Sequence, residues 1–129
     1  MISVIVVPET GEYSLDVSHG DSIYINAKLG IPKLKDHNAL YVAPFWLEQK
    51  NQGVERIYHI IDHYPHPSGK FYEIVMGNSF RLNRKKPWND MGNHRKFEYH
   101  NLADFGMMEL MPGYLIPIRH NERWSHAKG

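Results

Sequence analysis

The chain has 129 residues, of which 42% are hydrophobic and 22% are charged, and it contains no Cys. This length predicts a single domain, residues 1–129, that buries a core of its own. The absence of Cys excludes disulfides, thiolate catalysis and Cys-ligated zinc. No run approaches the roughly 20 apolar residues of a membrane span, and the opening MISVIVVP lacks the basic start and the length of a signal peptide. We therefore expect a cytoplasmic protein with no membrane partner.

The net charge is only +1, but the charges are unevenly distributed along the chain. Residues 1–27 contain four acidic residues and no Lys or Arg, whereas residues 80–100 contain six basic residues against two acidic ones. The six are Arg81, Arg84, Lys85, Lys86, Arg95 and Lys96. Because Trp88 and Phe97 lie among them, the segment has the composition of a phosphate-binding rim with aromatic faces for bases. A solvated loop with several cations is the alternative.

The N-terminal part predicts three extended segments. Residues 2–7 are a dense β-branched run, and the alternation in residues 13–17 predicts the second arm of a hairpin. Residues 22–29 form the third extended segment, after which Gly and Pro break the chain. The polar residues 33–38 predict a surface loop.

Residues 39–64 are the most informative stretch. ALYVAPFW, residues 39–46, predicts a buried strand because Pro44 would cost an interior helix about 3 kcal/mol. Residues 54–64 are ambiguous: apolar residues recur at helical spacing, whereas the Ile-rich and Tyr-rich content and the stop at Pro65 are typical of a strand. The Gly-containing turn between the two segments favours a hairpin, and a helix is the alternative.

The second half of the chain predicts further strands around one long loop. A turn at residues 66–70 leads into a strand at residues 71–77, which residues 78–82 continue beyond a bend. Residues 83–96 contain Pro, Gly and several Asn, so we expect an irregular loop of the length that usually carries function.

The C-terminal part predicts one short helix. Asn101 is a good N-cap for LADFGMM, and Asp104 favours the first-turn dipole. PGYLIPI, residues 112–118, predicts a last extended piece. The apolar side chains expected in the core of this part are Met107, Met108, Leu110, Met111 and Tyr114, together with Tyr24 from the N-terminal part.

These elements predict a mainly β (α+β) domain, a small bent sheet or pseudo-barrel of about five to seven strands with one to three short helices. Their order, YVAPFW, GVERIYHI, FYEIVMGNSFRLN, a basic Pro-Trp loop and FEYHNLADFG, resembles the PUA-like superfamily of small β-barrels, which includes the ASCH, EVE and YTH domains. The resemblance covers about residues 38–115. It implies a module that binds DNA or RNA, often by holding a modified or flipped base in an aromatic-lined pocket, and that acts beside a nuclease or a modification enzyme.

The residues expected to contact nucleic acid are of two kinds. Cations bind phosphates, and accessible aromatic side chains stack on bases. The complete set is Tyr41, Phe45, Trp46, Tyr64, Arg81, Arg84, Lys85, Lys86, Trp88, Arg95 and Lys96. For Tyr41, Phe45 and Trp46 the alternative is a place in the core.

Histidines support a rival interpretation, a small metal-dependent hydrolase. HIIDHYPH contains His59, His63 and His66, and on a helix the first two share one face, as in metal sites. On a strand they lie about 13 Å apart, too far to hold one ion. The sequence contains no HExxH, GxSxG, P-loop or GxGxxG motif, and it lacks the Gly-x-Lys-x-x-Glu-x-Arg pattern of the ASCH group. Enzymatic activity is thus open, and a binding module without metal or cofactor is favoured.

Overall fold

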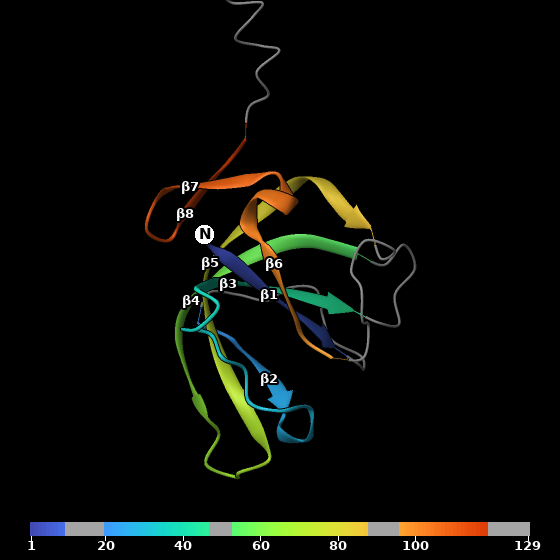
Figure 1. Cartoon of the computed structure of the whole chain (residues 1–129), viewed down its shortest axis with the longest axis vertical. Coiled ribbons are helices and arrows are strands. Elements are labelled where there is room, and N and C mark those ends of the chain that lie inside the picture. The colour runs from blue at the N-terminus through green and yellow to red at the C-terminus, as the bar shows by residue number, and fades with distance from the viewer. Residues whose placement is uncertain (10–19, 47–52, 88–95, 119–129) are drawn as a thin grey trace, which may run out of the picture.

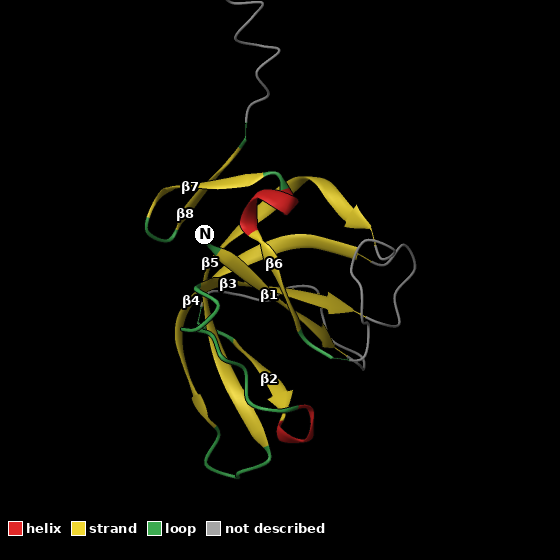
Figure 2. Ribbon diagram, in the orientation of Figure 1, coloured by secondary structure: helices red, strands yellow, loops and turns green. Residues whose placement is uncertain are grey.

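Strands dominate the computed structural model, which describes residues 1–9, 20–46, 53–87 and 96–118 (Figure 1, Figure 2). The strands are β1 (Ser3–Glu9), β2 (Ser22–Asn26), β3 (Ala39–Trp46), β4 (Gly53–Pro65), β5 (Phe71–Pro87), β6 (Glu98–Asn101), β7 (Met107–Met111) and β8 (Tyr114–Pro117). Within these segments the helices are short 3-10 turns, η1 (Ala27–Leu29) and η3 (Leu102–Phe105). The prediction of a mainly β fold is confirmed.

Six of the strands form one mixed sheet in the order β2-β5-β4-β3-β1-β6. β1 and β3 are parallel, and the other neighbouring pairs are antiparallel. β7 and β8 form a separate hairpin, which lies across one end of the domain (Figure 1). In the described part of the chain β2 and β6 are the edges of the large sheet, so the sheet does not close. Its long strands are curved (Figure 1).

β4 and β5 form a long curved hairpin that runs through most of the height of the folded domain (Figure 1). The strand prediction for residues 54–64 is confirmed, because β4 pairs with β5 from Gly53 to Pro65. The strand buries Val54, Ile57 and Tyr58. Val54 and Ile57 belong to the same apolar cluster, and the pairing with β5 is irregular between them, which breaks the alternation of the strand. Tyr58 belongs to the cluster on the opposite face, so two adjacent residues are both buried.

The prediction of an irregular loop at residues 83–96 is wrong for residues 83–87. β5 continues to Pro87, where it still pairs with Gly53, and Lys86 pairs with Val54. The charged side chains do not interrupt the strand because none of them is fully buried: Arg81 and Arg84 are exposed, and Lys85 and Lys86 are half-buried. Leu82 alone among residues 81–86 is buried. Residues 88–95 lie outside the described segments.

The centre of the large sheet is buried on both faces. Val4 and Val6 belong to one apolar cluster with Tyr41, whereas Ile5 and Val7 belong to a second cluster. Side chains of η3, β7 and β8 complete the first cluster, and side chains of β2 complete the second. Because successive residues of a strand point to opposite faces, burial on both sides explains the nearly continuous apolar runs of β1 and β3.

Most of β1 cannot form the hairpin that was predicted between residues 2–7 and residues 13–17. One edge of β1 pairs with β3 along Ser3–Glu9, and the other pairs with β6 over residues 3–6. Both edges are therefore occupied over residues 3–6. Residues 13–17 lie outside the described segments.

The predicted C-terminal helix is shorter than expected. Asn101 occupies the N-cap position, but its side chain makes no capping hydrogen bond. η3 ends at Phe105 and is followed by Gly106, whose φ of 71° is a left-handed conformation that readily stops a helix. The methionines that follow begin β7. None of the helices in the described segments has the length and apolarity needed to cross a membrane.

Several side chains expected in the core face solvent instead. Of the methionines in β7 only Met107 is buried. A two-stranded hairpin places one of its faces on the rest of the domain, so alternate residues point outward. The residues for which the core prediction is wrong are Met108, Leu110, Met111, Tyr114 and, on the edge strand β2, Tyr24, which are 46–58% exposed.

Candidate functional site

Two arginines face each other on adjacent strands of the long hairpin. Arg56 on β4 pairs directly with Arg81 on β5, and both side chains are exposed. Side chains opposite each other in an antiparallel pair have Cβ atoms about 5 Å apart, where like charges are destabilising. An anion placed between the two guanidinium groups would remove this repulsion. Arg56 was not among the residues predicted from the sequence, because only the strand register shows its position.

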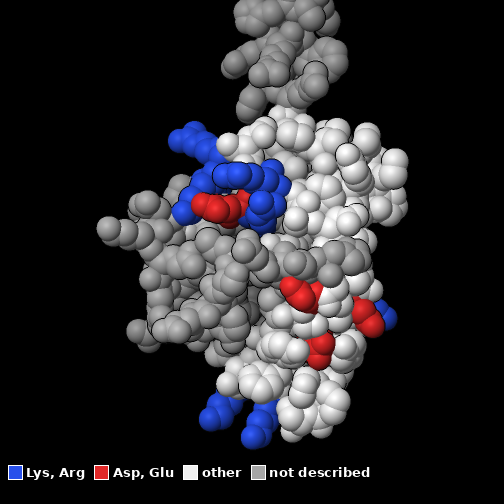
Figure 3. All heavy atoms as spheres, turned by 180° about the vertical axis from the view of Figure 1, so that it is seen from behind, with Lys and Arg blue, Asp and Glu red and all other residues white. Residues whose placement is uncertain are grey.

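Three more cations follow on β5. Lys85 Nζ lies 3.6 Å from Glu55 Oε1, and Lys86 Nζ donates a hydrogen bond to the backbone oxygen of Asp104 at 3.2 Å. Arg84 is exposed and, like the two opposed arginines, has no ion pair with another described residue. Figure 3 shows Lys and Arg side chains gathered around a few carboxylates near one end of the visible face. We call Arg56, Arg81, Arg84, Lys85 and Lys86 the basic surface.

Of the aromatic residues predicted to accompany these cations, the three whose side chains the structure describes do not join them. Tyr41 and Phe45 are 0% and 1% exposed, so neither has a free face for a base and their assignment as base contacts is wrong. Tyr64 is partly exposed but lies near the other end of β4, where it pairs with Glu73. The Trp46 side chain, Trp88 and Arg95 lie outside what the structure describes.

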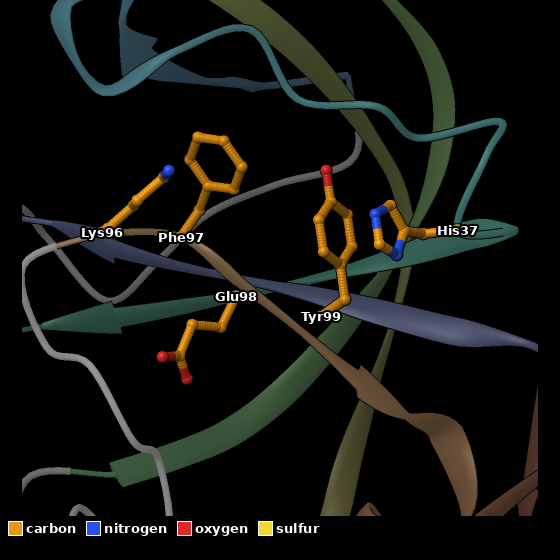
Figure 4. Close-up of a pocket in the computed structure, with 5 residues that line it drawn as sticks. All are labelled: His37, Lys96, Phe97, Glu98 and Tyr99. Carbon is orange, nitrogen blue, oxygen red and sulfur yellow. The ribbon is translucent and has the colours of Figure 1, made fainter.

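A shallow pocket of about 460 Å³ lies beside β6 and is lined by His37, Lys96, Phe97, Glu98 and Tyr99 (Figure 4). Lys96, Phe97 and Tyr99 project to one side of the chain, and Glu98 projects to the other. Lys96 Nζ lies 5.6 Å from the centre of the Phe97 ring. The pocket thus combines aromatic surface with one cation, Lys96. Lys96 is one of the residues predicted from the sequence to bind nucleic acid.

The pocket wall contains a pre-stacked pair of rings. His37 and Tyr99 are parallel within 4°, with ring centres 3.7 Å apart. The Tyr99 hydroxyl accepts a hydrogen bond from the backbone N–H of Lys33 at 2.8 Å, and burial raises the pKa of Tyr99. His37 is exposed. Sequence reasoning missed both residues, because the polar segment before β3 gives no sign that it folds over β6.

A polar contact joins β7 to the large sheet. The buried Tyr41 hydroxyl donates a hydrogen bond to Glu109 Oε2 at 2.5 Å, and the Tyr41 ring centre lies 5.4 Å from that of His59. Burial, and then the neighbouring Glu109 carboxylate, raise the pKa of Tyr41 well above its ordinary value. A raised pKa means that this contribution to stability is complete below the pKa of an unfolded Tyr and is lost only as the pH rises through strongly alkaline values. At neutral pH the contact therefore holds the hairpin in place.

The three histidines of the alternative metal site have separate surroundings. His59 lies against Tyr41, His63 Nδ1 is 2.6 Å from the Tyr72 hydroxyl, and the His66 ring nitrogen is 2.8 Å from a serine hydroxyl two residues along the chain. No group of three His, Asp or Glu side chains in the described segments could hold a metal ion. The structure therefore does not assemble the His59, His63 and His66 cluster.

No protein-family model matches the sequence, no curated protein is significantly similar to it, and no solved structure matches the chain. The resemblance to the PUA-like superfamily consequently rests on the pattern of strands and aromatic residues.

Gly113→Ala should lower the free energy of unfolding by about 2–3 kcal/mol, because strain and a steric clash act together. Gly113 has φ +80°, and a Cβ added there would lie 2.8 Å from His59 Cε1. In the His59→Ala background the clash disappears, so the same substitution should cost only about 1 kcal/mol. Denaturant unfolding of the four proteins of this double-mutant cycle measures the difference.

Gly69→Ala is the matched control for Gly113→Ala. Gly69 has a similar φ of +73°, but an added Cβ would meet no atom within 4 Å. It should therefore show the strain alone, at about 1 kcal/mol. Equal costs for Gly113→Ala with and without the His59 ring would contradict the packing of the β7–β8 turn on β4.

Proposed function

We propose that the chain is a PUA-like, non-catalytic module that binds DNA or RNA and that its basic surface contacts the phosphates. The observation that carries the proposal is the direct pairing of Arg56 with Arg81, both exposed and neither ion-paired with another described residue. Two guanidinium groups side by side are unfavourable for a protein alone and favourable when a phosphate lies between them.

The chemistry of the side chains favours a phosphate over other anions. Arg presents a planar set of donors that fits phosphate oxygens in a bidentate manner, and Arg84 adds a third such group on the same strand. Lys85 and Lys86 already contact Glu55 and a backbone oxygen. We therefore assign the stronger phosphate contacts to the three arginines and weaker ones to the two lysines.

We infer that the pocket beside β6 receives a base of the nucleic acid. The pocket beside β6 offers a pre-stacked aromatic pair, His37 with Tyr99, and one cation, Lys96. Its volume lies in the range of small-molecule sites and suffices for a single base. A modified or flipped base that stacks on His37, with its phosphate near Lys96, accounts for this arrangement. A nuclease or modification enzyme is the kind of partner that would use such a module.

The binding proposal is tested by fluorescence anisotropy with single-stranded and double-stranded DNA and RNA at a series of salt concentrations. With three phosphate contacts on duplex DNA, the logarithm of the binding constant should fall with the logarithm of salt concentration with a slope of about −3. In a second arm, His37→Ala should leave this slope unchanged and reduce the preference among bases. Absence of binding to every nucleic acid at low salt would refute the proposal.

A further inference from the structure

A row of three side chains crosses the outer face of the sheet far from the basic surface. Tyr24 on β2 pairs with Glu73 on β5, and Glu73 pairs with Tyr64 on β4. The two tyrosines are 46% and 37% exposed, and Glu73 is partly exposed between them. Directly paired residues have Cβ atoms about 5 Å apart, so the tyrosines flank the carboxylate on both sides at about 10 Å from each other.

The carboxylate of this row is held in one orientation. Glu73 Oε2 accepts a hydrogen bond from Ser22 Oγ at 2.6 Å and another from the Tyr64 hydroxyl at 2.9 Å. The Ser22 hydrogen bond is the main cause of a lowered pKa of Glu73, so the group is ionised at neutral pH. Both bonds end on Oε2, and within the described residues Oε1 receives none. Glu73 Oε1 can therefore contact a ligand.

The tyrosine on the β2 side is also fixed by its neighbours. The Tyr24 ring packs edge-on against Phe71 and His66, with centroid distances of 6.0 Å and 5.8 Å. Phe71 is itself 37% exposed. These contacts hold the Tyr24 ring beside the carboxylate and add apolar surface next to it.

We propose that Tyr24, Glu73 and Tyr64 bind an organic cation, namely an ammonium or guanidinium group on an apolar stem such as a Lys or Arg side chain of a partner protein. The negative faces of aromatic rings attract cations, and a carboxylate adds a full opposite charge at the same place. The apolar stem covers the exposed rings. A neutral sugar could stack on the rings, but it would meet few hydrogen-bonding groups besides Glu73 Oε1. An anion would be repelled by the Glu73 carboxylate.

This inference is independent of nucleic-acid binding. The row lies near the Pro65 end of β4, whereas Arg56 and Arg81 lie toward its Gly53 end. The two sites differ in sign and suit opposite ligands. A chain with both would hold nucleic acid at one end of the long hairpin and a basic segment of a partner at the other.

The probes are choline and its uncharged carbon isostere, dimethylbutanol, titrated into the isotope-labelled protein and followed by amide chemical shifts. The titration is run at neutral pH, where the lowered pKa of Glu73 keeps its carboxylate ionised. Choline should shift the amides of Tyr24, Tyr64 and Glu73 in a saturable manner, and the isostere should bind about fivefold more weakly. Equal binding of both probes, or choline shifts only elsewhere on the protein, would overturn the proposal.

Glu73→Gln removes the charge while its amide oxygen can still accept the two hydrogen bonds, and it should weaken choline binding about fivefold. Glu55→Gln, at the other end of the hairpin, is the matched control and should change nothing. Tyr24→Leu leaves the carboxylate and its hydrogen bonds in place and should weaken choline binding about threefold. If folded Glu73→Gln and Tyr24→Leu proteins both bind choline as the wild type does, the row is not a cation site.

Discussion

Phe45→Ala should lower the free energy of unfolding by about 3–5 kcal/mol, the usual cost of removing a fully buried Phe ring. Phe45 is 1% exposed and belongs to the cluster that contains Tyr41 and Leu82. The loss combines the transfer free energy of the ring with the cavity that remains, because neighbouring strands of a paired sheet cannot collapse into it. Chemical denaturation followed by circular dichroism measures the change as a shift of midpoint at constant slope.

Leu40→Ala on the same strand is the control for this prediction. Leu40 is 38% exposed, so its truncation should cost less than about 1 kcal/mol. The pair also separates a core role from a base-binding role for Phe45. A Phe45→Ala protein that unfolds at the wild-type denaturant concentration and yet binds nucleic acid more weakly would show that Phe45 contacts a base after all.

The double variant Arg56→Gln, Arg81→Gln should bind duplex DNA about 10- to 100-fold more weakly at low salt, with a salt slope reduced by about 2. Each arginine that contacts a phosphate releases about one counterion, so loss of both removes two units of slope and affects all sequences alike. Stability should remain the same or increase, because the variant removes a like-charge pair from opposite positions. Anisotropy titrations and thermal unfolding of the same samples test both statements.

Lys28→Gln, Lys70→Gln is the matched control for the arginine variant. It removes the same net charge from two exposed positions outside the basic surface. A general effect of net charge would weaken binding equally in both double variants. If only the arginine variant loses affinity, the phosphates contact the basic surface; if the two variants bind alike, the basic surface is not the nucleic-acid interface.

The sequence alone was sufficient for the elements whose patterns are local. The dense apolar runs of β1 and β3 predicted strands, and they are strands because both faces of the sheet centre are buried. The Pro65 stop and the Ile-rich and Tyr-rich content outweighed the helical spacing in β4, and the strand prediction is confirmed. Composition also indicated the concentration of cations in the second half of the chain.

Predictions from local sequence pattern were wrong where the conformation of a segment depends on the segment that pairs with it. β5 continues through the Lys and Arg residues because Gly53 and Val54 pair with it there, and a strand needs a hydrogen-bonded neighbour more than it needs apolar side chains. Met108 and Leu110 are exposed because a two-stranded hairpin covers the domain with one face only. Neither the pairing partner of β5 nor the packing of the β7–β8 hairpin can be deduced from the residues of the segment itself.

The candidate sites depended most on the tertiary structure. Arg56 meets Arg81, His37 stacks on Tyr99, and Tyr24 shares a row with Glu73 and Tyr64, each through pairing or packing of segments distant in sequence. A sequence determines which side chains are available and which face of a strand each can occupy. Register and bulges decide which of them become neighbours, because a shift of one residue moves a side chain to the opposite face of the sheet.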